Sequence, residues 1–355
     1  MHTDRSGAVV AGSGDRHYAT LMGIARGYQR SQALAVAAEL GIADLLGGGR
    51  RTVGDLATTT GTDEPSLYRL LRALASIGVF HEDDERRFSL TDMGELLRRD
   101  HPQSVDPAVR MFCADYQWRA WGELSHSVRT GGNAAVHTLG TDVWEHRRRN
   151  PQDGVVFDAA MRTMAGSYAD GVLAAHDFGT YDLVADIGGG TGTMLAAVLD
   201  AHPAVRGILA EQPEVLAGAP VVLDAAGVAD RVTLVECDFF AEVPKGADAY
   251  VLLRVLHDWV DEDAARILRR VREAMDPSAR VLIIDAVVGP PNEDPLTKFL
   301  DMMMLVSAGG RERTRGRVDS AAGGDRIPPR EHRPRRTGPC RDRRRPGRLS
   351  RSWHS

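Results

Sequence analysis

The stretch LVADIGGGTGT, residues 183–193, carries the clearest indication of the fold. Its apolar first half is typical of a buried strand, and it runs through a glycine-rich turn into a segment with helical spacing. Glycines in such a turn let backbone N–H groups approach a ligand without obstruction by side chains. We therefore expect Asp186, Gly188 and Gly190 to line a ligand-binding turn at the end of a strand.

The same turn matches the dinucleotide-binding fingerprint only in part. In the G-x-G-x-x-G register the three key positions are Gly188, Gly190 and Thr193, so the last position holds neither glycine nor alanine. A glycine-rich turn alone is weak support for any ligand, and this departure argues against a bound dinucleotide.

Beyond this turn, strand-like and helix-like segments alternate along the chain. Apolar strand candidates lie at 206–211, 231–237, 249–256 and 280–288. This alternation predicts an α/β fold with a Rossmann-like, mostly parallel sheet. Ligands of such sheets bind at the carboxyl ends of the strands, so the residues that follow the strands are the functional candidates.

Two of these strand ends carry acids suited to a nucleoside. Glu211 lies 25 residues after Asp186, where a carboxylate can accept hydrogen bonds from both ribose hydroxyls. Asp238 can accept from an exocyclic amine, and Phe239 can cover a base. Together with the glycine-rich turn, these residues indicate an adenosine site.

A further strand candidate ends in VLLRVLHDWVDED, residues 251–263. His257 in this stretch has two interpretations. It is either a catalytic base at the carboxyl end of the strand or a histidine at the edge of the core that satisfies a local hydrogen bond. The stretch alone favours the second interpretation, and only its context reverses that preference.

The motifs DIGGGTG, CDFF and RVLHDW, with Glu211 between the first two, resemble those of the class I S-adenosylmethionine-dependent methyltransferases. Within them, the chain is similar over roughly residues 20–314 to the small-molecule O-methyltransferases with a winged-helix dimerisation domain. The resemblance implies S-adenosylmethionine as cofactor. It places Gly188 against the cofactor, Glu211 on its ribose, and Asp238, Phe239 and Arg254 near its adenine.

The resemblance also implies that His257 is the catalytic base and that Asp285 and Glu312 are the acids beside it. A phenol with a pKa of about 10 is mostly protonated at neutral pH, so a base must remove its proton during attack on the methyl group. A neutral imidazole does this when its other nitrogen donates to a fixed carboxylate. The neighbouring Asp258 is either a helix-cap residue or a substrate contact.

The acidic run 261–263 raises the alternative of a divalent metal site. It directly precedes a helical segment, where negative charge stabilises the helix N-terminus. The other strand ends offer no convincing set of oxygen ligands, so we predict a metal-independent enzyme.

Phe157, Met161 and Met164 are spaced as one face of a helix, and Met303 lies in a second methionine-rich helix before Glu312. Apolar side chains that share one helix face in this way usually pack into the hydrophobic core. The resemblance implies that this region lines the acceptor pocket, so Met161 and Met303 are candidate substrate contacts. An apolar pocket with one polar anchor favours an aromatic hydroxyl over an amine or an acid.

The segment 21–105 combines short amphipathic helices with two strand candidates and a charged turn, which predicts a winged-helix unit. Winged helices often bind DNA, but residues 63–100 hold nine acids against six arginines. The N-terminal 310 residues carry a net charge of −15, which argues against any nucleic-acid partner. We expect a module for homodimerisation instead.

Composition sets the remaining limits. The 355 residues are 43% hydrophobic, enough for a sizeable core in two domains. No apolar run of membrane-spanning length and no leader-like start occurs, which predicts neither a membrane partner nor export. The three cysteines lack CxxC spacing, which fits a reducing compartment and the cytoplasm.

After Thr314 the chain departs from the family pattern of one amphipathic helix and two strands. Residues 311–355 hold 15 arginines against five acids, and the apolar residues after 314 are few. This composition predicts a disordered tail. Either the coding frame shifts near residue 315, which we prefer, or the tail is a basic interaction segment; resequencing that finds the frame intact would remove the first reading.

The sequence therefore predicts an S-adenosylmethionine-dependent O-methyltransferase acting on an aromatic hydroxyl in antibiotic or other secondary metabolism. Two alternatives remain, a family member that decarboxylates or hydroxylates instead of methylating, and a DNA-binding regulator. The predicted divisions are a flexible N-terminus (1–20), a winged-helix dimerisation domain (21–105), a helical connector with the acceptor pocket (106–180), a cofactor-binding catalytic domain (181–314) and the tail (315–355).

Overall fold

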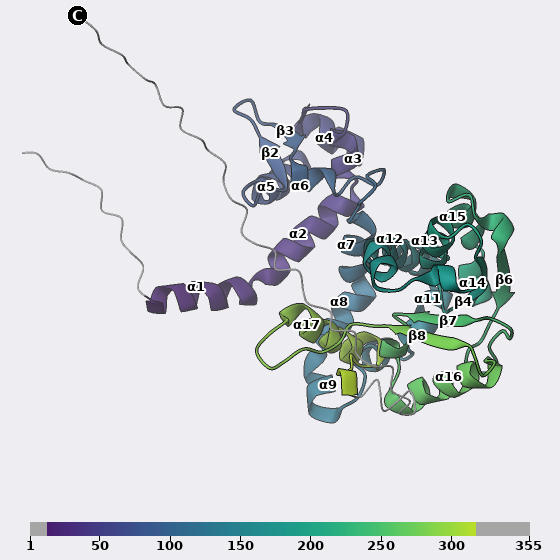
Figure 1. Ribbon diagram of the computed structural model, residues 1–355. Coiled ribbons are helices and arrows are strands. Elements are labelled where there is room, and N and C mark those ends of the chain that lie inside the picture. Colours follow the sequence, from purple (N-terminus) through teal and green to yellow (C-terminus); the bar gives the residue numbers. More distant parts are fainter. Residues whose placement is uncertain (1–12, 317–355) are drawn as a thin grey trace, which may run out of the picture.

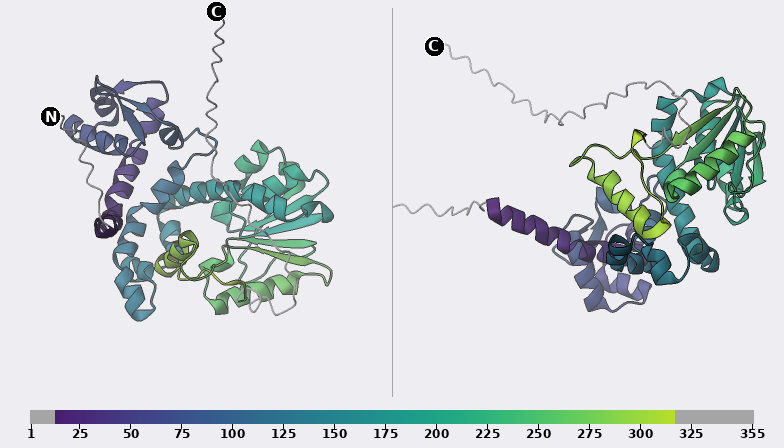
Figure 2. Two further views of the ribbon diagram at one scale, coloured as in Figure 1. Left: turned by 60° about the vertical axis from the view of Figure 1, so that its left-hand side comes forward. Right: turned by 90° about the horizontal axis from the view of Figure 1, so that it is seen from below.

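The computed structural model describes residues 13–316 (Figure 1). A small helical part with a short sheet stands apart from a larger α/β part, and helices join the two (Figure 2). The predicted fold class, a Rossmann-like domain preceded by a mainly helical winged-helix domain, is confirmed.

The chain begins with two helices, α1 (Ser13–Ala25) and α2 (Gly27–Glu39). Residues 13–20, which we expected to belong to a flexible N-terminus, form part of α1, and residues 1–12 lie outside the described part. The helical run over 27–46 is interrupted at Gly41, whose φ of 65° is left-handed and separates α2 from the next helix.

The winged-helix unit follows the predicted order of helices and strands. Its helix starts are capped as the sequence indicates, because Thr52, Asp63 and Thr91 each accept a hydrogen bond from the backbone N–H three residues on. Its elements are α3 (Ile42–Leu46), β1 (Arg51–Thr52), α4 (Val53–Thr60), α5 (Glu64–Ala75), β2 (Phe80–Glu82), β3 (Arg87–Leu90) and α6 (Asp92–Glu95).

The strands of this unit form an antiparallel sheet in the order β1-β3-β2. Leu67, Leu71 and Leu74 of α5 are buried in its core, as their spacing predicts. Ile77 is 42% exposed because α5 ends at Ala75 and the chain turns away at Gly78.

The segment between the two parts is helical, as predicted. Its helices are α7 (Asp106–Phe112), α8 (Asp115–Gly122), α9 (Leu124–Thr130), α10 (Ala134–Leu139), α11 (Val143–Arg149), the long α12 (Pro151–Ala175) and the short 3₁₀ turn η1 (Phe178–Thr180). The first turn of α12 starts with Pro151, which suits the helix start because the missing N–H has no partner there.

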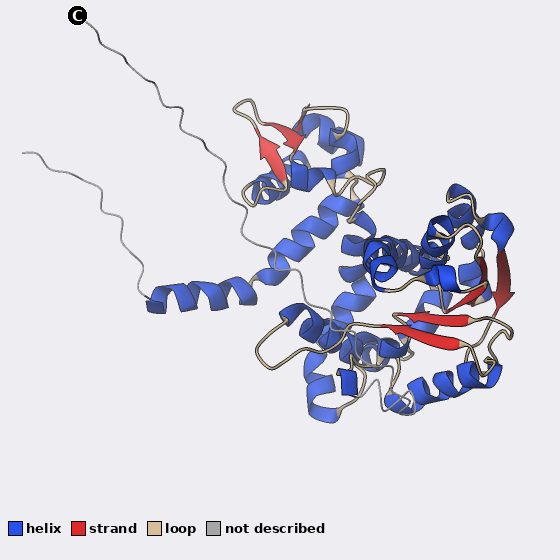
Figure 3. Ribbon diagram, viewed as in Figure 1, coloured by secondary structure: helices blue, strands red, loops and turns tan. Residues whose placement is uncertain are grey.

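The α/β part contains a five-stranded, fully parallel sheet in the order β6-β5-β4-β7-β8 (Figure 3). The glycine-rich turn follows the central strand, so the strand order reverses next to it. The strands are β4 (Leu183–Ile187), β5 (Arg206–Glu211), β6 (Val232–Glu236), β7 (Ala249–Leu253) and β8 (Arg280–Ile284).

Each face of this sheet is covered by its own apolar core. One face packs against α12, α13, α14 and α15, and the other against α16. The covering helices and turns are α13 (Thr193–Ala201), α14 (Pro213–Leu216), α15 (Ala219–Ala225), η2 (Ala229–Arg231), η3 (Leu256–Asp258) and α16 (Asp261–Ala274).

The described chain ends with α17 (Pro295–Met303) and the π-helical turn η4 (Met304–Ala308), followed by a short extended segment. Arg313 of that segment pairs with Val287 in an isolated parallel bridge after β8. From residue 317 onward, the predicted disordered tail lies outside the described residues. Within residues 13–316, no helix is both long and apolar enough to cross a membrane.

Candidate active site

The carboxyl ends of the parallel strands bring the predicted cofactor residues to one edge of the sheet. Asp186 lies in β4, whose neighbours are β5 and β7, and Glu211 is the last residue of β5. Asp238 follows β6 and is exposed at the same edge. This shared edge is the consequence of an all-parallel sheet.

The glycine-rich turn has the geometry that requires glycine. Gly188 and Gly190 have φ values of 68° and 59°, in the left-handed region. A Cβ on Gly188 would lie 3.0 Å from Val255 Cγ2 and 3.5 Å from the Phe239 ring, so the backbone here approaches its neighbours closely. At Gly190 the space beside the Cα is open.

Glu211 is held at its strand end by two backbone donors. Its carboxylate accepts from the N–H of Gly190 at 3.0 Å and from the N–H of Gln212 at 2.7 Å. Each carboxylate oxygen has two lone pairs, so both oxygens can accept a further hydrogen bond from a ligand. Burial raises the pKa of Glu211 in spite of these two donors.

Asp186 is the most deeply buried acid of the site, with 1% of its surface exposed. Burial raises its pKa to about 7, and the nearby Glu211 carboxylate adds to that rise. Neither of its oxygens has a hydrogen-bond partner at ordinary distance in the described chain, although the nearby Leu195 backbone N–H lowers its pKa against burial. A buried acid without a strong donor is costly and points to a polar ligand group.

Aromatic rings gather beside the turn. The Phe239 ring lies 5.1 Å from the Phe240 ring and 6.0 Å from the Trp259 ring, and Trp259 in turn stacks on Trp144 at 6.3 Å. The sequence pattern predicts no role for Trp259, and the one signal that could have indicated it is its position two residues after His257.

His257 lies in η3, directly after β7, and is 7% exposed. Its Nδ1 lies 2.8 Å from Glu312 Oε1, so the Nδ1–H donates to the carboxylate and Nε2 keeps its lone pair. Nε2 lies 3.6 Å from the nearest oxygen of Asp258. The chain therefore brings together His257 and Glu312, which are 55 residues apart.

Three further charged groups surround this pair. The Arg254 guanidinium lies 3.3 Å from the Glu312 oxygen that accepts from His257. Arg254 also has a left-handed φ of 57°, a strained conformation that is often found at functional sites.

Asp285 forms no hydrogen bond or ion pair with His257 in the described structure, and one of its oxygens is buried without a partner. Burial raises its pKa to about 6, and the charges of His257 and Arg254 oppose that rise. The charge of Asp285 nevertheless contributes to raising the pKa of His257. Burial likewise raises the pKa of Asp258.

The pKa of His257 reflects opposing influences. Burial lowers it, but the Asp258 carboxylate and the hydrogen bond to Glu312 outweigh that influence and raise the pKa above its usual value. The Arg254 charge lowers it and the Asp285 charge raises it. The imidazole therefore holds its proton to a higher pH than a free histidine.

Arg313 fixes the turn that carries His257, although the sequence pattern predicts no role for it. Its guanidinium donates to the carbonyls of Leu256 at 2.7 Å and Trp259 at 2.8 Å, and to Asp261 at 2.9 Å. The backbone N–H of Arg311 donates to the His257 carbonyl at 2.8 Å. Nothing in the sequence pattern distinguishes this arginine from its neighbours.

Gly310 allows that close approach. A Cβ at this position would collide with the backbone of His257 and Asp258, so only glycine lets the segment lie against the turn. The backbone N–H of Glu312 donates to Asp301 of α17 at 2.9 Å. The segment 310–313 therefore positions both members of the His257–Glu312 pair.

The candidate substrate contacts lie on two helices. Met161 of α12 and Met303 of α17 are both half-buried, whereas the neighbouring Met304 is 6% exposed and packs as core. No measured contact joins either methionine to His257, so their role as substrate contacts stays a prediction.

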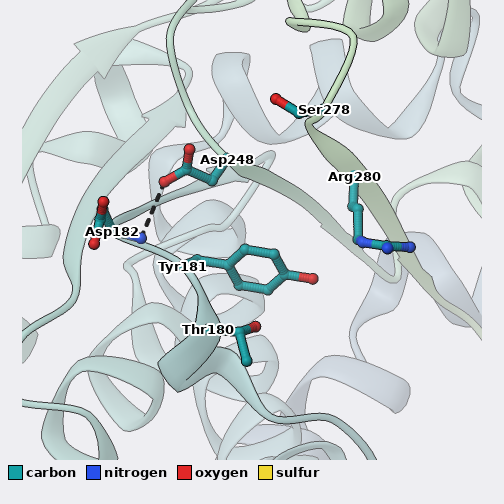
Figure 4. A pocket seen from close by; sticks show the side chains of 6 residues that line it. All are labelled: Thr180, Tyr181, Asp182, Asp248, Ser278 and Arg280. Carbon is teal, nitrogen blue, oxygen red and sulfur yellow. Dashed lines mark hydrogen bonds between the residues drawn. The ribbon is translucent and has the colours of Figure 1, made fainter.

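A shallow polar hollow of 480 Å³ lies at the opposite edge of the sheet (Figure 4). It is lined by Thr180, Tyr181, Asp182, Asp248, Ser278 and Arg280. Asp248 and Arg280 stand at the amino ends of β7 and β8, away from His257, so this hollow is not part of the candidate site. Within residues 13–316, no cluster of three or more His, Cys, Asp or Glu residues is arranged to hold a metal.

The residues at the carboxyl edge of the sheet fit an adenosyl cofactor. The glycine-rich turn leaves open space at Gly190, Glu211 has free lone pairs, and Asp186 lacks a strong donor. Phe239 supplies an aromatic face beside the same turn. These are the features that ribose hydroxyls, an ammonium group and an adenine ring require.

Comparison with known proteins agrees with this arrangement. An O-methyltransferase domain matches residues 121–324, and an O-methyltransferase dimerisation domain matches residues 22–100. The chain is 41% identical over 301 residues to mitomycin biosynthesis 6-O-methyltransferase of Streptomyces lavendulae, which covers 83% of this chain and 84% of that protein.

Solved structures give the same result. The crystal structure of LaPhzM superposes with a TM-score of 0.84 at 39% identity, over 86% of this chain and 93% of that one. An O-methyltransferase from neocarzinostatin biosynthesis, solved with S-adenosylmethionine and a naphthoic acid, has a TM-score of 0.72 at 34% identity over 82% of this chain and 89% of that one.

Two relatives are named for other activities. An 8-amino-8-demethylriboflavin N,N-dimethyltransferase of Streptomyces davaonensis is 43% identical and covers 81% of this chain and 83% of that protein. Aclacinomycin 10-hydroxylase RdmB of Streptomyces purpurascens is 36% identical and covers 82% of this chain and 79% of that protein. Most of the matched relatives are nevertheless O-methyltransferases. The cofactor is S-adenosylmethionine. The chain belongs to the O-methyltransferase family and is an S-adenosylmethionine-dependent O-methyltransferase with a dimerisation domain.

Proposed function

We propose that this enzyme methylates a phenolic hydroxyl of an aromatic small molecule in antibiotic or other secondary metabolism, with His257 as the general base. The supporting observation is the 2.8 Å hydrogen bond from His257 Nδ1 to Glu312, which leaves Nε2 as a proton acceptor at the carboxyl edge of the sheet. A histidine that merely satisfied a local hydrogen bond would not need two carboxylates and an arginine around it.

In the proposed reaction, S-adenosylmethionine supplies an electrophilic methyl group on its sulfonium. His257 Nε2 takes the proton of the acceptor hydroxyl as the oxygen attacks, and Glu312 stabilises the imidazolium that forms. Asp285 and Asp258 add negative charge that favours the same imidazolium. Arg313 keeps the histidine in place, because orientation supplies much of the rate.

The remaining proposed roles follow the predicted site. Asp186, Gly188, Gly190, Glu211 and the pair Asp238 and Phe239 would bind the cofactor, and Asp258, Met161 and Met303 would contact the acceptor. Arg254 lies at the Glu312 carboxylate, so we assign it to charge balance around His257 rather than to the adenine.

The identity of the product tests this function. The protein is incubated with S-adenosylmethionine and a panel of aromatic alcohols, amines and carboxylic acids, with and without a chelator, and products are identified by mass spectrometry. We expect one added methyl group on a hydroxyl, equally with chelator. An added oxygen or lost carbon dioxide would support the hydroxylase or decarboxylase alternative, and methylation only of amines would overturn the hydroxyl assignment.

We also infer that the enzyme is a homodimer joined through its N-terminal helices. Helix α1 projects away from the rest of the described chain (Figures 1 and 2), and it exposes Tyr18 by 70%, Leu21 by 66% and Ile24 by 72%. These residues recur every third position, so they form one apolar stripe, which in a soluble monomer would be unusual. A second copy of the chain is the partner that the dimerisation domain suggests.

Replacing Leu21 and Ile24 with glutamate should convert the dimer into a monomer. Each apolar side chain contributes roughly 1.5–3 kcal/mol when it is buried, so losing two should weaken association by about 10²-fold or more. Sedimentation equilibrium measures this change. The matched control is Val221→Glu on α15, where another apolar side chain is 73% exposed; a double variant that remains as dimeric as this control would contradict the inference.

The pH dependence of methyl transfer provides a second check. Only the neutral imidazole can accept the proton, so kcat/KM should rise with pH. Because Asp258, Glu312 and Asp285 together raise the pKa of His257 against burial and Arg254, the midpoint of that rise should lie above 6.5. A profile measured with an acceptor that does not titrate in this range reports it, and a midpoint below 6.5 would contradict the assignment.

The charge of the chain and its cysteines bear on two further parts of the proposal, the absence of a nucleic-acid partner and a cytoplasmic location. The negative net charge of the N-terminal 310 residues disfavours binding of nucleic acid, and a gel-shift assay at physiological salt would detect such binding. Cys113 and Cys237, the cysteines in the described chain, are both unpaired, which suits the cytoplasm.

A further inference from the structure

Arg147 is a buried arginine whose hydrogen-bonding capacity is mostly unused. It lies on α11 and is 9% exposed, whereas the side chains of the adjacent Arg148 and Arg149 are 58% and 66% exposed. Its Nε donates to the Tyr116 hydroxyl at 3.3 Å, and its buried Nη1 has no partner in the described chain. A guanidinium carries five N–H donors, so a single neutral acceptor leaves it far from satisfied.

Aromatic rings hold this guanidinium in place. Its Cζ lies 3.5 Å from the centre of the Phe157 ring, 5.0 Å from that of Trp144 and 5.7 Å from that of Tyr116. Such rings fix the plane of the group and attract its charge, but they cannot accept its N–H hydrogen bonds as an anion does. These three rings, here called the aromatic cage, therefore orient the N–H donors of Arg147 and leave them available to a ligand.

The cage borders the catalytic residues. Trp144 stacks on Trp259, which follows Asp258 and His257 directly. Burial raises the pKa of Asp258, and the Arg147 charge is among those that oppose this rise. Arg147 thus lies within electrostatic reach of the acid next to the general base.

The cage also borders the cofactor residues. Burial raises the pKa of Asp158 on α12, and the Arg147 charge opposes that rise. The Asp158 charge in turn raises the pKa of Glu211, the residue assigned to the ribose. The charge of Arg147 therefore influences Asp258, beside His257, and Asp158, whose charge in turn influences Glu211.

We propose that Arg147 is the receptor for a carboxylate of a bound small molecule, carried either by the aromatic acceptor or by the amino-acid end of the cofactor. A planar guanidinium matches a carboxylate with two parallel hydrogen bonds, and burial among aromatic rings strengthens such a pair. The unpartnered Nη1 and the absence of a neutralising acid at hydrogen-bond distance in the described chain are what this role requires. This inference deepens the proposed function, but its test measures binding only.

The test compares ligands that differ only at the carboxylate. Binding of a naphthalene carboxylate and of the corresponding carboxamide is measured by quenching of tryptophan fluorescence, and binding of S-adenosylmethionine and of its decarboxylated form by calorimetry. The full chain is used as wild type, Arg147→Met and Arg147→Lys. Methionine keeps the packing among the rings, and lysine keeps the charge without the planar fork. Arg149→Met on the same helix is the matched control, and thermal melting shows that each variant folds.

The expected result is a loss of about tenfold to hundredfold in affinity for one carboxylate ligand in Arg147→Met, with a smaller loss in Arg147→Lys and none in the control. A loss confined to the naphthalene carboxylate identifies the acceptor as the source, and one confined to intact S-adenosylmethionine identifies the cofactor. Equal losses with and without the carboxylate, or no loss at all, would overturn the proposal. Because no methyl transfer is measured, failure of the proposed reaction leaves this result unaffected.

Discussion

Replacing His257 with alanine is expected to lower kcat/KM for methyl transfer by about 10²- to 10⁴-fold, the usual contribution of a general base. In the proposed reaction Nε2 accepts the proton, and the hydrogen bond from Nδ1 to Glu312 orients it. Cofactor affinity should stay within about threefold of wild type, because the proposal places His257 beside the acceptor and not against the cofactor. Steady-state kinetics and calorimetry measure the two quantities.

Two controls keep this expectation falsifiable. His137→Ala removes an exposed histidine from α10 and should leave the rate unchanged. His257→Gln keeps a polar side chain of similar size in the buried position, so it separates loss of the base from loss of packing. If His257→Gln retained wild-type activity, His257 would have the structural role that its sequence context also allowed.

Replacing Glu312 with glutamine should lower kcat by about 10- to 10²-fold, as changes to the partners of a functional histidine typically do. The buried carboxylate holds the Nδ1–H tautomer and stabilises the imidazolium, and a neutral amide does neither as well. The hydrogen bond to Glu312 raises the pKa of His257. Its loss should therefore also move the rising limb of the pH–rate profile to lower pH.

The pH shift distinguishes positioning from general damage. A variant that merely loosened the fold would lose activity without moving the midpoint. Glu273→Gln, which alters an exposed side chain on α16, is the matched control and should change neither rate nor midpoint. A Glu312→Gln profile with the wild-type midpoint would mean that Glu312 does not act on His257.

Local sequence signals predicted much of the framework because they depend on few residues. The caps Thr52, Asp63 and Thr91 satisfy N–H groups one turn away, so their function is readable from adjacent positions. The parallel sheet places all strand ends at one edge, which is why Glu211 and Asp186 could be paired from sequence.

The contacts of Arg147 and Arg313 could not be predicted, because they depend on burial and on residues far apart in the sequence. The spacing of neighbouring residues does not encode such contacts. In the run of arginines at 147–149, only Arg147 turns inward, and its sole sequence signal is that it lies one helical turn after the buried Val143. Arg313 binds carbonyls of Leu256 and Trp259 that are more than 50 residues away, and no local pattern predicts that.

The catalytic arrangement is assembled from the described part of the chain. Gly310, Glu312 and Arg313 hold the His257 turn, and all three precede residue 315, where the predicted tail begins. If the tail comes from a shifted frame, restoring the family pattern there should alter stability more than the chemistry at His257.

If His257 removes the proton of the acceptor, the loss of activity in His257→Ala should depend on whether the acceptor is already ionised. Methyl transfer by wild type and His257→Ala is measured on two phenols of similar size, one protonated at the assay pH and one nitro-substituted and already ionised. The account predicts a deficit of about 10²-fold or more on the protonated phenol and of less than about tenfold on the ionised one. An equal deficit on both would contradict it.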